Sequence, residues 1–120
     1  MFLSALCLAA NVYFESRGEP IDGQILVAEV TMNRVHDKAY PKNVCSVVYQ
    51  DRQFSWTSEP HEVDDLGAFI TAYRVATEVL DNGCVLCTDA THYHTIDSSP
   101  YWSDDLQVVG EYGNHIFYKE

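Results

Sequence analysis

Apolar residues recur every three or four positions in the first part of this chain, the spacing of one buried face of an α-helix. A first helix is predicted over residues 3–14, with Ser4 as a candidate N-cap and Gly18 as the residue that ends it. A second helix is predicted over residues 20–35, because Pro20 suits the first helical position and an apolar stripe follows it.

A third helix is predicted in the middle of the chain. Asp64 or Asp65 is suited to cap its start, its apolar positions continue through Leu80, and the Asn-Gly pair at 82–83 closes it. The shorter apolar run 44–50 fits either a helix or a strand, because periodicity does not separate the two over so few residues.

The last third of the chain changes from helical periodicity to β-branched and aromatic residues. Strands are predicted over 91–96, 106–109 and 115–118, with a hairpin turn in the glycine-containing segment 110–114. Residues 52–60 are predicted to form an aromatic-containing loop. Helices followed by a small antiparallel sheet indicate an α+β fold.

The composition is globular and strongly acidic. The 120 residues are 47% hydrophobic and 21% charged, which excludes a disordered chain, and we expect a single domain over residues 1–120 and a monomer. Eighteen acidic against seven basic side chains give a net charge of −11, which argues against nucleic acid and anionic membranes as partners. We expect no cofactor.

Neither a membrane span nor a signal peptide is expected. The chain has no run of 18 apolar residues. The apolar segment 2–10 continues into the first predicted helix, and no basic residue precedes it. We therefore expect a protein made in the cytoplasm and released by another component, or encoded by a phage.

The four cysteines do not predict a disulfide framework. Cys7 belongs to a helical apolar pattern, Cys45 to a short apolar run, and Cys84 and Cys87 form a C-x-x-C pair. A chain of this size buries enough apolar surface to fold without cross-links, so we expect one or two free, buried thiols.

Glu15 is the candidate general acid. It lies in the last turn of the first predicted helix, where the helix dipole disfavours a charged carboxylate, and Tyr13 and Phe14 beside it would withhold water. Both effects raise the pKa of the carboxyl, which suits acid catalysis of glycosidic cleavage. Arg17 opposes this shift if its guanidinium folds onto Glu15. The ordinary alternative is an exposed surface glutamate.

Glu19 does not pair readily with Glu15, although the two are four positions apart. Gly18 breaks the helix between them, and the residue before a proline avoids helical conformation. Glu19 is therefore expected to serve the start of the second helix, and a mechanism that uses one carboxylate fits this chain more easily.

Five sequence blocks follow one another along nearly the whole chain. They are LAANVYFESRGEPIDGQILVAEVTMNRV (8–35), YPKNVCSVVYQ (40–50), QFSW (53–56), ATHYH (90–94) and GNHIFY (113–118). One block alone would be weak evidence, but all five in this order and spacing resemble the SleB/CwlJ family of cell-wall hydrolases.

This resemblance implies a peptidoglycan-cleaving enzyme with a lysozyme-like helical part and a small antiparallel sheet. The expected reaction is cleavage of the glycan strand between N-acetylmuramic acid and N-acetylglucosamine, as a lytic transglycosylase that forms 1,6-anhydro ends. The family's catalytic glutamate corresponds to Glu15, in agreement with the reasoning from the residues themselves. Peptidoglycan is accordingly the expected partner.

Candidate substrate contacts come from the polar and aromatic residues of the later blocks. Gln53 and Ser55 suit sugar hydroxyls and acetamido groups, while Trp56 and Trp102 offer ring faces for sugars or for the core. The last two blocks resemble site-lining elements, which adds His92, Tyr93, His94, Asn114 and His115.

Three alternatives remain open. A hydrolytic muramidase or glucosaminidase needs a second carboxylate, for which Glu19 and Glu29 are the candidates. A zinc hydrolase would use the three histidines at positions 92, 94 and 115, with a cysteine of the C-x-x-C pair nearby, but their spacing is a weak signal and we expect no metal. A peptidoglycan-binding module without catalysis would not need Glu15.

Overall fold

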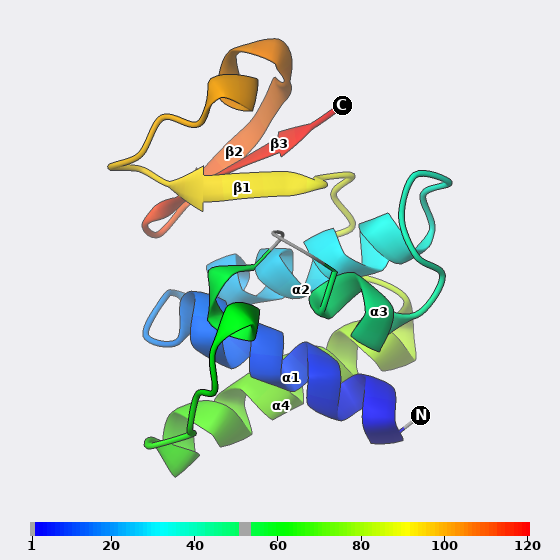
Figure 1. The fold of residues 1–120 in the computed structure, drawn as a ribbon, viewed down its shortest axis with the longest axis vertical. Helices are drawn as coiled ribbons and strands as arrows, with labels where there is room; N and C mark the ends of the chain where they lie inside the picture. The colour runs from blue at the N-terminus through cyan, green and yellow to red at the C-terminus, as the bar shows by residue number, and fades with distance from the viewer. Residues whose placement is uncertain (1, 51–53) are drawn as a thin grey trace.

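The computed structural model describes residues 2–50 and 54–120, and these form a helical lobe below a small sheet (Figure 1). The helical lobe contains α1 (Phe2–Ser16), α2 (Ile21–Val35), α3 (Val44–Val48), the short 3-10 helix η1 (Ser55–Ser58) and α4 (Leu66–Asn82). The sheet lobe contains β1 (His92–Thr95), the 3-10 helix η2 (Tyr101–Asp105), β2 (Gln107–Tyr112) and β3 (His115–Lys119). The predicted α+β order of helices followed by strands is confirmed.

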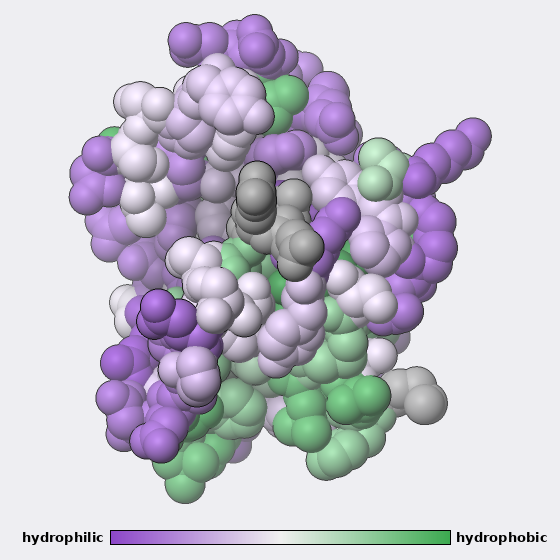
Figure 2. Space-filling view, in the orientation of Figure 1, coloured by the Kyte–Doolittle hydropathy of each residue, from purple (hydrophilic) through white to green (hydrophobic). Residues whose placement is uncertain are grey.

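The hydrophobic core lies mainly between α1, α2 and α4. Its members are small and branched apolar side chains on the inward faces of these helices, such as Leu8, Val12, Leu26, Val30 and Val79. In Figure 2 the hydrophobic surface gathers over the lower, helical end of the molecule, and hydrophilic residues surround the sheet lobe. Among the described residues, no helix has the length and apolar character needed to cross a membrane.

Side-chain caps mark the starts of two helices, α3 and α4. Oδ1 of Asn43 accepts a hydrogen bond of 2.8 Å from the N–H of Ser46, so the run 44–50, ambiguous in sequence, begins as helix α3. Asp65 caps α4 as predicted, by accepting from the N–H of Ala68 at 3.0 Å. The predicted N-cap Ser4 is wrong, because α1 already begins at Phe2 and Ser4 lies inside it.

The sheet is antiparallel, with the strand order β1-β3-β2. The turn between β2 and β3 is shorter than predicted, because β2 continues to Tyr112. Gly113 makes this turn at φ +60, a conformation that glycine adopts without strain. Phe117 from β3 is fully buried and joins the core of the helical lobe.

Two polar side chains of α2, the half-buried Asn33 and the buried Arg34, tie the two lobes together. Nδ2 of Asn33 donates to the main-chain oxygens of Thr88 and Ala90, at 3.0 and 2.8 Å. Nε of Arg34 donates to the main-chain oxygen of Thr91 at 2.8 Å. These hydrogen bonds provide donors for the carbonyl oxygens of the segment that leads into β1. They therefore fix the position of β1 above α2.

All four cysteines are paired, which corrects the expectation of free thiols. Cys7 of α1 bonds to Cys45 of α3 across 38 positions, and Cys84 bonds to Cys87 within the loop after α4. The sequence argument failed because it asked only whether cross-links were needed for folding. Local sequence patterns do not predict that α1 packs beside α3, where the Cα atoms of Cys7 and Cys45 are 5.3 Å apart.

Candidate active site

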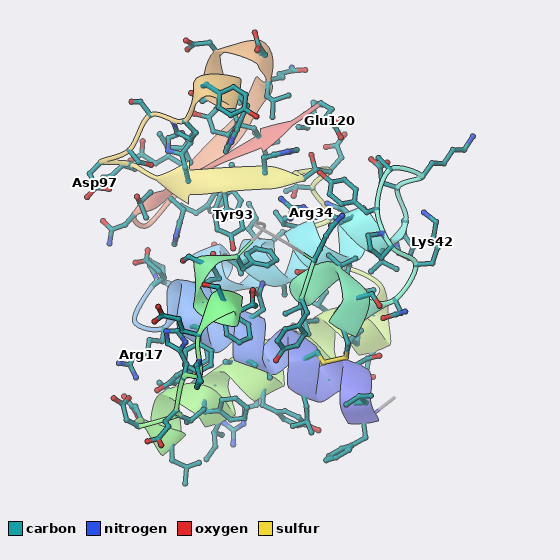
Figure 3. The ribbon with its side chains drawn as sticks, viewed as in Figure 1. Arg17, Arg34, Lys42, Tyr93, Asp97 and Glu120 are labelled. Atoms are coloured by element: carbon teal, nitrogen blue, oxygen red, sulfur yellow. A yellow bond between two sulfur atoms is a disulfide. The ribbon has the colours of Figure 1, made fainter. Side chains whose placement is uncertain are left out.

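Glu15 lies at the border between the lobes, in the last turn of α1. Its Oε1 accepts a hydrogen bond of 2.5 Å from the hydroxyl of Tyr93. Figure 3 shows Tyr93 pointing from β1 toward the helical lobe. Gly18, at φ +82, ends the turn that follows α1, so the helix stops close behind the carboxylate. The site therefore joins residues from the first helix and the first strand.

Burial raises the pKa of the Glu15 carboxyl above its ordinary value. The hydrogen bond from Tyr93 and the positive charge of Arg34 act in the opposite direction, with smaller effect. Burial and the neighbouring Glu15 hold the pKa of Tyr93 well above its usual value, so this phenol keeps its proton and remains a donor. A carboxyl whose proton is retained toward neutral pH has the property required of a general acid.

The aromatic residues predicted to shield Glu15 have other principal partners. The hydroxyl of Tyr13 donates to Asp64 Oδ1 at 3.0 Å, and the ring of Phe14 packs against Trp56 at 4.8 Å between centroids. Nη1 of Arg17 pairs with the same Asp64 oxygen at 2.5 Å, so its guanidinium is engaged away from Glu15. The aromatic side chain that forms a hydrogen bond with Glu15 is that of Tyr93.

Arg34 is a site residue that the sequence reasoning missed. It is buried on α2, and its guanidinium carbon lies 5.4 Å from the ring centre of Phe54 and 5.1 Å from that of Tyr40. Its charge lowers the pKa of Glu15. The available signal was a lone arginine in the last turn of the predicted second helix, close to its apolar stripe.

The second predicted carboxylate, Glu19, holds the β2–β3 turn. Its Oε1 accepts from the backbone N–H of Asn114 at 2.7 Å, and its Oε2 accepts from Nδ2 of the same residue at 3.0 Å. These bonds lower the pKa of Glu19. Nδ1 of His115 lies 4.0 Å from Glu19 Oε1 and has no hydrogen-bond partner among the described residues. Glu19 and the predicted contact Asn114 thus bind each other.

The other reserve carboxylate, Glu29, is used inside the fold. It is 1% exposed and accepts four backbone N–H bonds, of 2.7 to 3.2 Å, from residues 85–88. A carboxylate enclosed in this way has no room for an attacking water. The prediction of Glu29 as a reserve second carboxylate is therefore wrong, because the loop closed by the second disulfide covers it.

The described residues of the QFSW block, 54–56, lie on the helical side of the site. Gln53 falls outside the described residues. Ser55 is exposed at the start of η1, and Trp56 is half-buried with its Nε1 donating to Asn11 Oδ1 at 2.8 Å. Trp56 packs against the core and also lines an open cavity, while its contact with a sugar stays a prediction.

His92 and His94 share one face of β1 as predicted, but it is the face turned away from Glu15. Since neighbouring side chains of a strand alternate, Tyr93 faces the helical lobe and the two histidines face η2. There Trp102 packs against both imidazoles, at 5.1 and 5.7 Å between ring centres, and His94 Nε2 bonds to the hydroxyl of Tyr118 at 2.7 Å. The prediction that these residues line the cleft beside Glu15 is wrong, because they form the packing under η2.

His115 lies apart from the other two histidines. It pairs with Thr95 in register and packs edge-on against Tyr93 at 5.3 Å, so it occupies the face toward the helical lobe. The proposed zinc triad is therefore split between the two faces of the sheet. Within residues 2–50 and 54–120, no group of three or more His, Cys, Asp or Glu side chains is placed to hold a metal ion.

Comparisons of the sequence with a family model and with individual proteins identify the same family. The Cell Wall Hydrolase family matches residues 18–118. The chain is 34% identical over 116 residues to the spore cortex-lytic enzyme of Bacillus cereus and 33% identical over 115 residues to that of Bacillus subtilis. These alignments cover 93% and 92% of this chain but 42% and 35% of the relatives, so the chain spans well under half of their length.

Solved structures show the same fold. The catalytic domain of the germination-specific lytic transglycosylase SleB from Bacillus anthracis superposes with a TM-score of 0.80 at 30% identity, covering 97% of this chain and 93% of that one. The catalytic domain of the Bacillus cereus SleB protein superposes with a TM-score of 0.76, also at 30% identity, covering 98% and 91%.

Proposed function

This chain belongs to the Cell Wall Hydrolase family, and from that premise we propose that it cleaves peptidoglycan glycan strands between N-acetylmuramic acid and N-acetylglucosamine, with Glu15 as general acid and base. The proposed reaction is that of a lytic transglycosylase. One observation carries it: the half-buried Glu15 carboxyl, its pKa raised by burial, is bound by Tyr93 at the border of the two lobes. The similar catalytic domain of known lytic activity supports the same assignment.

In the first step, protonated Glu15 donates its proton to the oxygen that bridges the two sugars. The bond between C1 of the muramoyl unit and that oxygen breaks, and the departing sugar leaves with a hydroxyl. Because Oε1 accepts from Tyr93, Oε2 is the oxygen left to carry the proton. The positive charge that develops at C1 then lies next to the newly formed Glu15 carboxylate, which stabilises it.

In the second step, the Glu15 carboxylate takes the proton of the muramoyl 6-hydroxyl. The freed oxygen attacks C1 of the same sugar and closes a 1,6-anhydro ring, which returns Glu15 to its protonated form. No water enters the products, so a single carboxyl suffices. This fits a site in which the two other candidates, Glu19 and Glu29, bind the Asn114 turn and the 85–88 loop.

The test is the glutamine variant of the acid. Glu15→Gln is nearly isosteric and should remove almost all lysis of purified sacculi, while Glu78→Gln, a change at an exposed glutamate of α4, should lyse them at the wild-type rate. More than about a tenth of wild-type activity in Glu15→Gln would correspond to less than 1.4 kcal/mol of lost transition-state stabilisation and would exclude Glu15 as the acid.

Product analysis separates transglycosylation from hydrolysis. Mass spectrometry should find muropeptides with anhydro ends, each one water lighter than the hydrolytic product, and digestion in heavy-oxygen water should leave them unlabelled. Reducible, labelled ends would show a hydrolase with a water-activating group still to be found.

The site of action we propose is the bacterial cell wall, outside the reducing cytoplasm. Both disulfides support this, because such bonds form and persist in oxidising surroundings. Synthesis in the cytoplasm followed by release through another component, or a phage origin, remains part of the same proposal.

A further inference from the structure

An open cavity of about 400 Å³ lies on the side of α1 that carries Phe14, between the end of α3 and the segment 56–61. Its volume is within the range of small-molecule sites, about 300–1,000 Å³. We propose that this cavity, here called the α3 pocket, binds one neutral N-acetylhexosamine unit of the glycan strand. The inference rests on the proposed function, because it names a further sugar site for the same substrate.

One wall of the α3 pocket is aromatic and already fixed in place. Nε1 of Trp56 is bound to Asn11, a fully buried residue, and one side of the indole packs against Phe14. Tyr49, which is 52% exposed, stands edge-on to Trp56 at 5.6 Å. Rigid aromatic rings of this kind pack against the apolar C–H faces of a sugar at a small cost in conformational entropy.

The other wall presents hydrogen-bond acceptors. The hydroxyls of Thr57 and Ser58 donate to main-chain oxygens at 2.7 and 2.8 Å, so each has only lone pairs left for a ligand. Nδ1 of His61 lies 2.8 Å from the main-chain oxygen of Glu59, so Nε2 is the ring nitrogen left for a ligand. The carboxylate of Glu59 is a further acceptor.

This chemistry selects the class of ligand. An acceptor-rich wall matches a ligand with many O–H donors and an amide N–H, as an N-acetylhexosamine has. The carboxylate of Glu59 and the acidic net charge of the chain oppose an anionic ligand. N-acetylglucosamine, which is neutral, therefore fits better than a sugar with a free carboxylate.

The α3 pocket is joined directly to the catalytic helix. Phe14 contacts both Trp56 and His61, at 4.8 and 5.4 Å between ring centres, and the next residue is Glu15. Successive helical residues point about 100° apart, so Phe14 faces the α3 pocket while Glu15 faces Tyr93. One glycan strand passing over the end of α1 would reach both sites.

The test is a fluorescence titration with chitotriose, three linked N-acetylglucosamine units. In a Trp102→Phe protein Trp56 is the remaining tryptophan, and its emission should change saturably with chitotriose. Tyr49→Ala should weaken binding at least about tenfold, whereas Tyr49→Phe, which keeps the ring, should bind within about twofold of the parent. Tyr101→Ala, at a 92% exposed tyrosine on η2, is the matched control and should bind unchanged.

The same variants should affect cleavage of long glycan strands through KM. Tyr49→Ala should raise KM with little change in kcat, because the α3 pocket contributes equally to ground-state and transition-state binding. N-acetylneuraminic acid, an acidic N-acetylated sugar, should not compete with chitotriose. Equal competition by this sugar would overturn the assignment of a neutral ligand.

The experiment separates failure of the α3 pocket from failure of the proposed function. An unchanged Trp56 emission up to about 10 mM chitotriose, with sacculi still cleaved in a Glu15-dependent way, would overturn the pocket alone. Saturable binding in the Glu15→Gln protein supports the pocket, since that variant cannot turn substrate over. If chitotriose binds saturably but Glu15→Gln still lyses sacculi, the sugar site is supported and the assignment of Glu15 as the acid is refuted.

Discussion

The hydroxyl of Tyr93 donates a hydrogen bond to Oε1 of Glu15 across 78 positions of the chain. The two residues belong to different lobes, and the bond between them also fixes which carboxyl oxygen can carry the acidic proton. Tyr93 is held in turn by rings on the same side of the sheet, Phe117 and His115, both 5.3 Å away. The acid therefore depends on the sheet for its orientation.

Removing the Tyr93 hydroxyl should change the pH dependence of the reaction. The bond lowers the pKa of Glu15, so Tyr93→Phe should raise this pKa and move the alkaline limb of the kcat/KM profile to higher pH. At the optimum, kcat should fall because the carboxyl loses its orienting donor. A pH series of initial lysis rates measures both effects.

The control for that variant is Tyr73→Phe on α4, which should leave the pH profile in place. An alkaline limb that stays at the wild-type position in Tyr93→Phe would show that Glu15 is not the group whose deprotonation ends activity.

Glu15→Gln should stabilise the folded protein at neutral pH while it inactivates the enzyme. Because the folded-state pKa of Glu15 is raised, the native state binds more protons than the unfolded state between the unfolded and folded pKa values. The free energy of unfolding of wild type therefore falls as pH rises through that interval, because the buried carboxyl must give up its proton. Glutamine has no proton to lose, so the free energy of unfolding of Glu15→Gln does not fall in this way. Melting curves should show a higher Tm for Glu15→Gln near pH 7 and no difference below about pH 4.

Glu29→Gln should destabilise the fold strongly. In wild type, both carboxylate oxygens of Glu29 accept hydrogen bonds from backbone N–H groups. Glutamine replaces one of these oxygens with an NH2 group, which cannot accept, so buried N–H donors would lose their acceptor. The expected loss is about 2–4 kcal/mol in the free energy of unfolding, measured in urea. The exposed Glu78→Gln should stay within about 0.5 kcal/mol of wild type, and an equally small effect for Glu29→Gln would contradict its buried role.

The two disulfides should contribute unequally. Cys7–Cys45 spans 38 positions, so the double alanine variant should lose about 4 kcal/mol on the loop-entropy scale. Cys84–Cys87 spans three positions, and its removal should cost about 2 kcal/mol. Denaturation with and without reductant measures both, because reductant should bring wild type down to the stability of the quadruple variant. Wild-type stability that reductant leaves unchanged would show that neither bond forms.

The helices and strands were predictable because their signals are local. Three- and four-residue periodicity defines the long helices, Asp65 caps α4 within three positions, and aromatic and β-branched residues mark β1 and β3. The 44–50 run was ambiguous from its apolar residues, and the cap that decided it, Asn43, lies one position outside that run.

Predictions about the site were weaker wherever they depended on distant contacts. Glu15 was chosen for local reasons, yet its partners Tyr93 and Arg34 come from a strand and from another helix. The alternation of β1 correctly put His92 and His94 on one face, but alternation does not say which face meets the helical lobe. The packing of the sheet on α2 decides which face of β1 meets the helical lobe, and in this structure it is the face that carries Tyr93.

The strand order β1-β3-β2 determines when the active site can form during synthesis of the protein. β3 is the last strand along the sequence but the middle one in the sheet, and β1 has it as its pairing partner. A growing polypeptide therefore carries Glu15 long before Tyr93 has a sheet to hold it, since an unpaired strand has little stability of its own. During synthesis, the acid remains without its phenol until residues 115–119 have left the ribosome. Under the proposed function, the orientation of the general acid is therefore one of the last features of this fold to form.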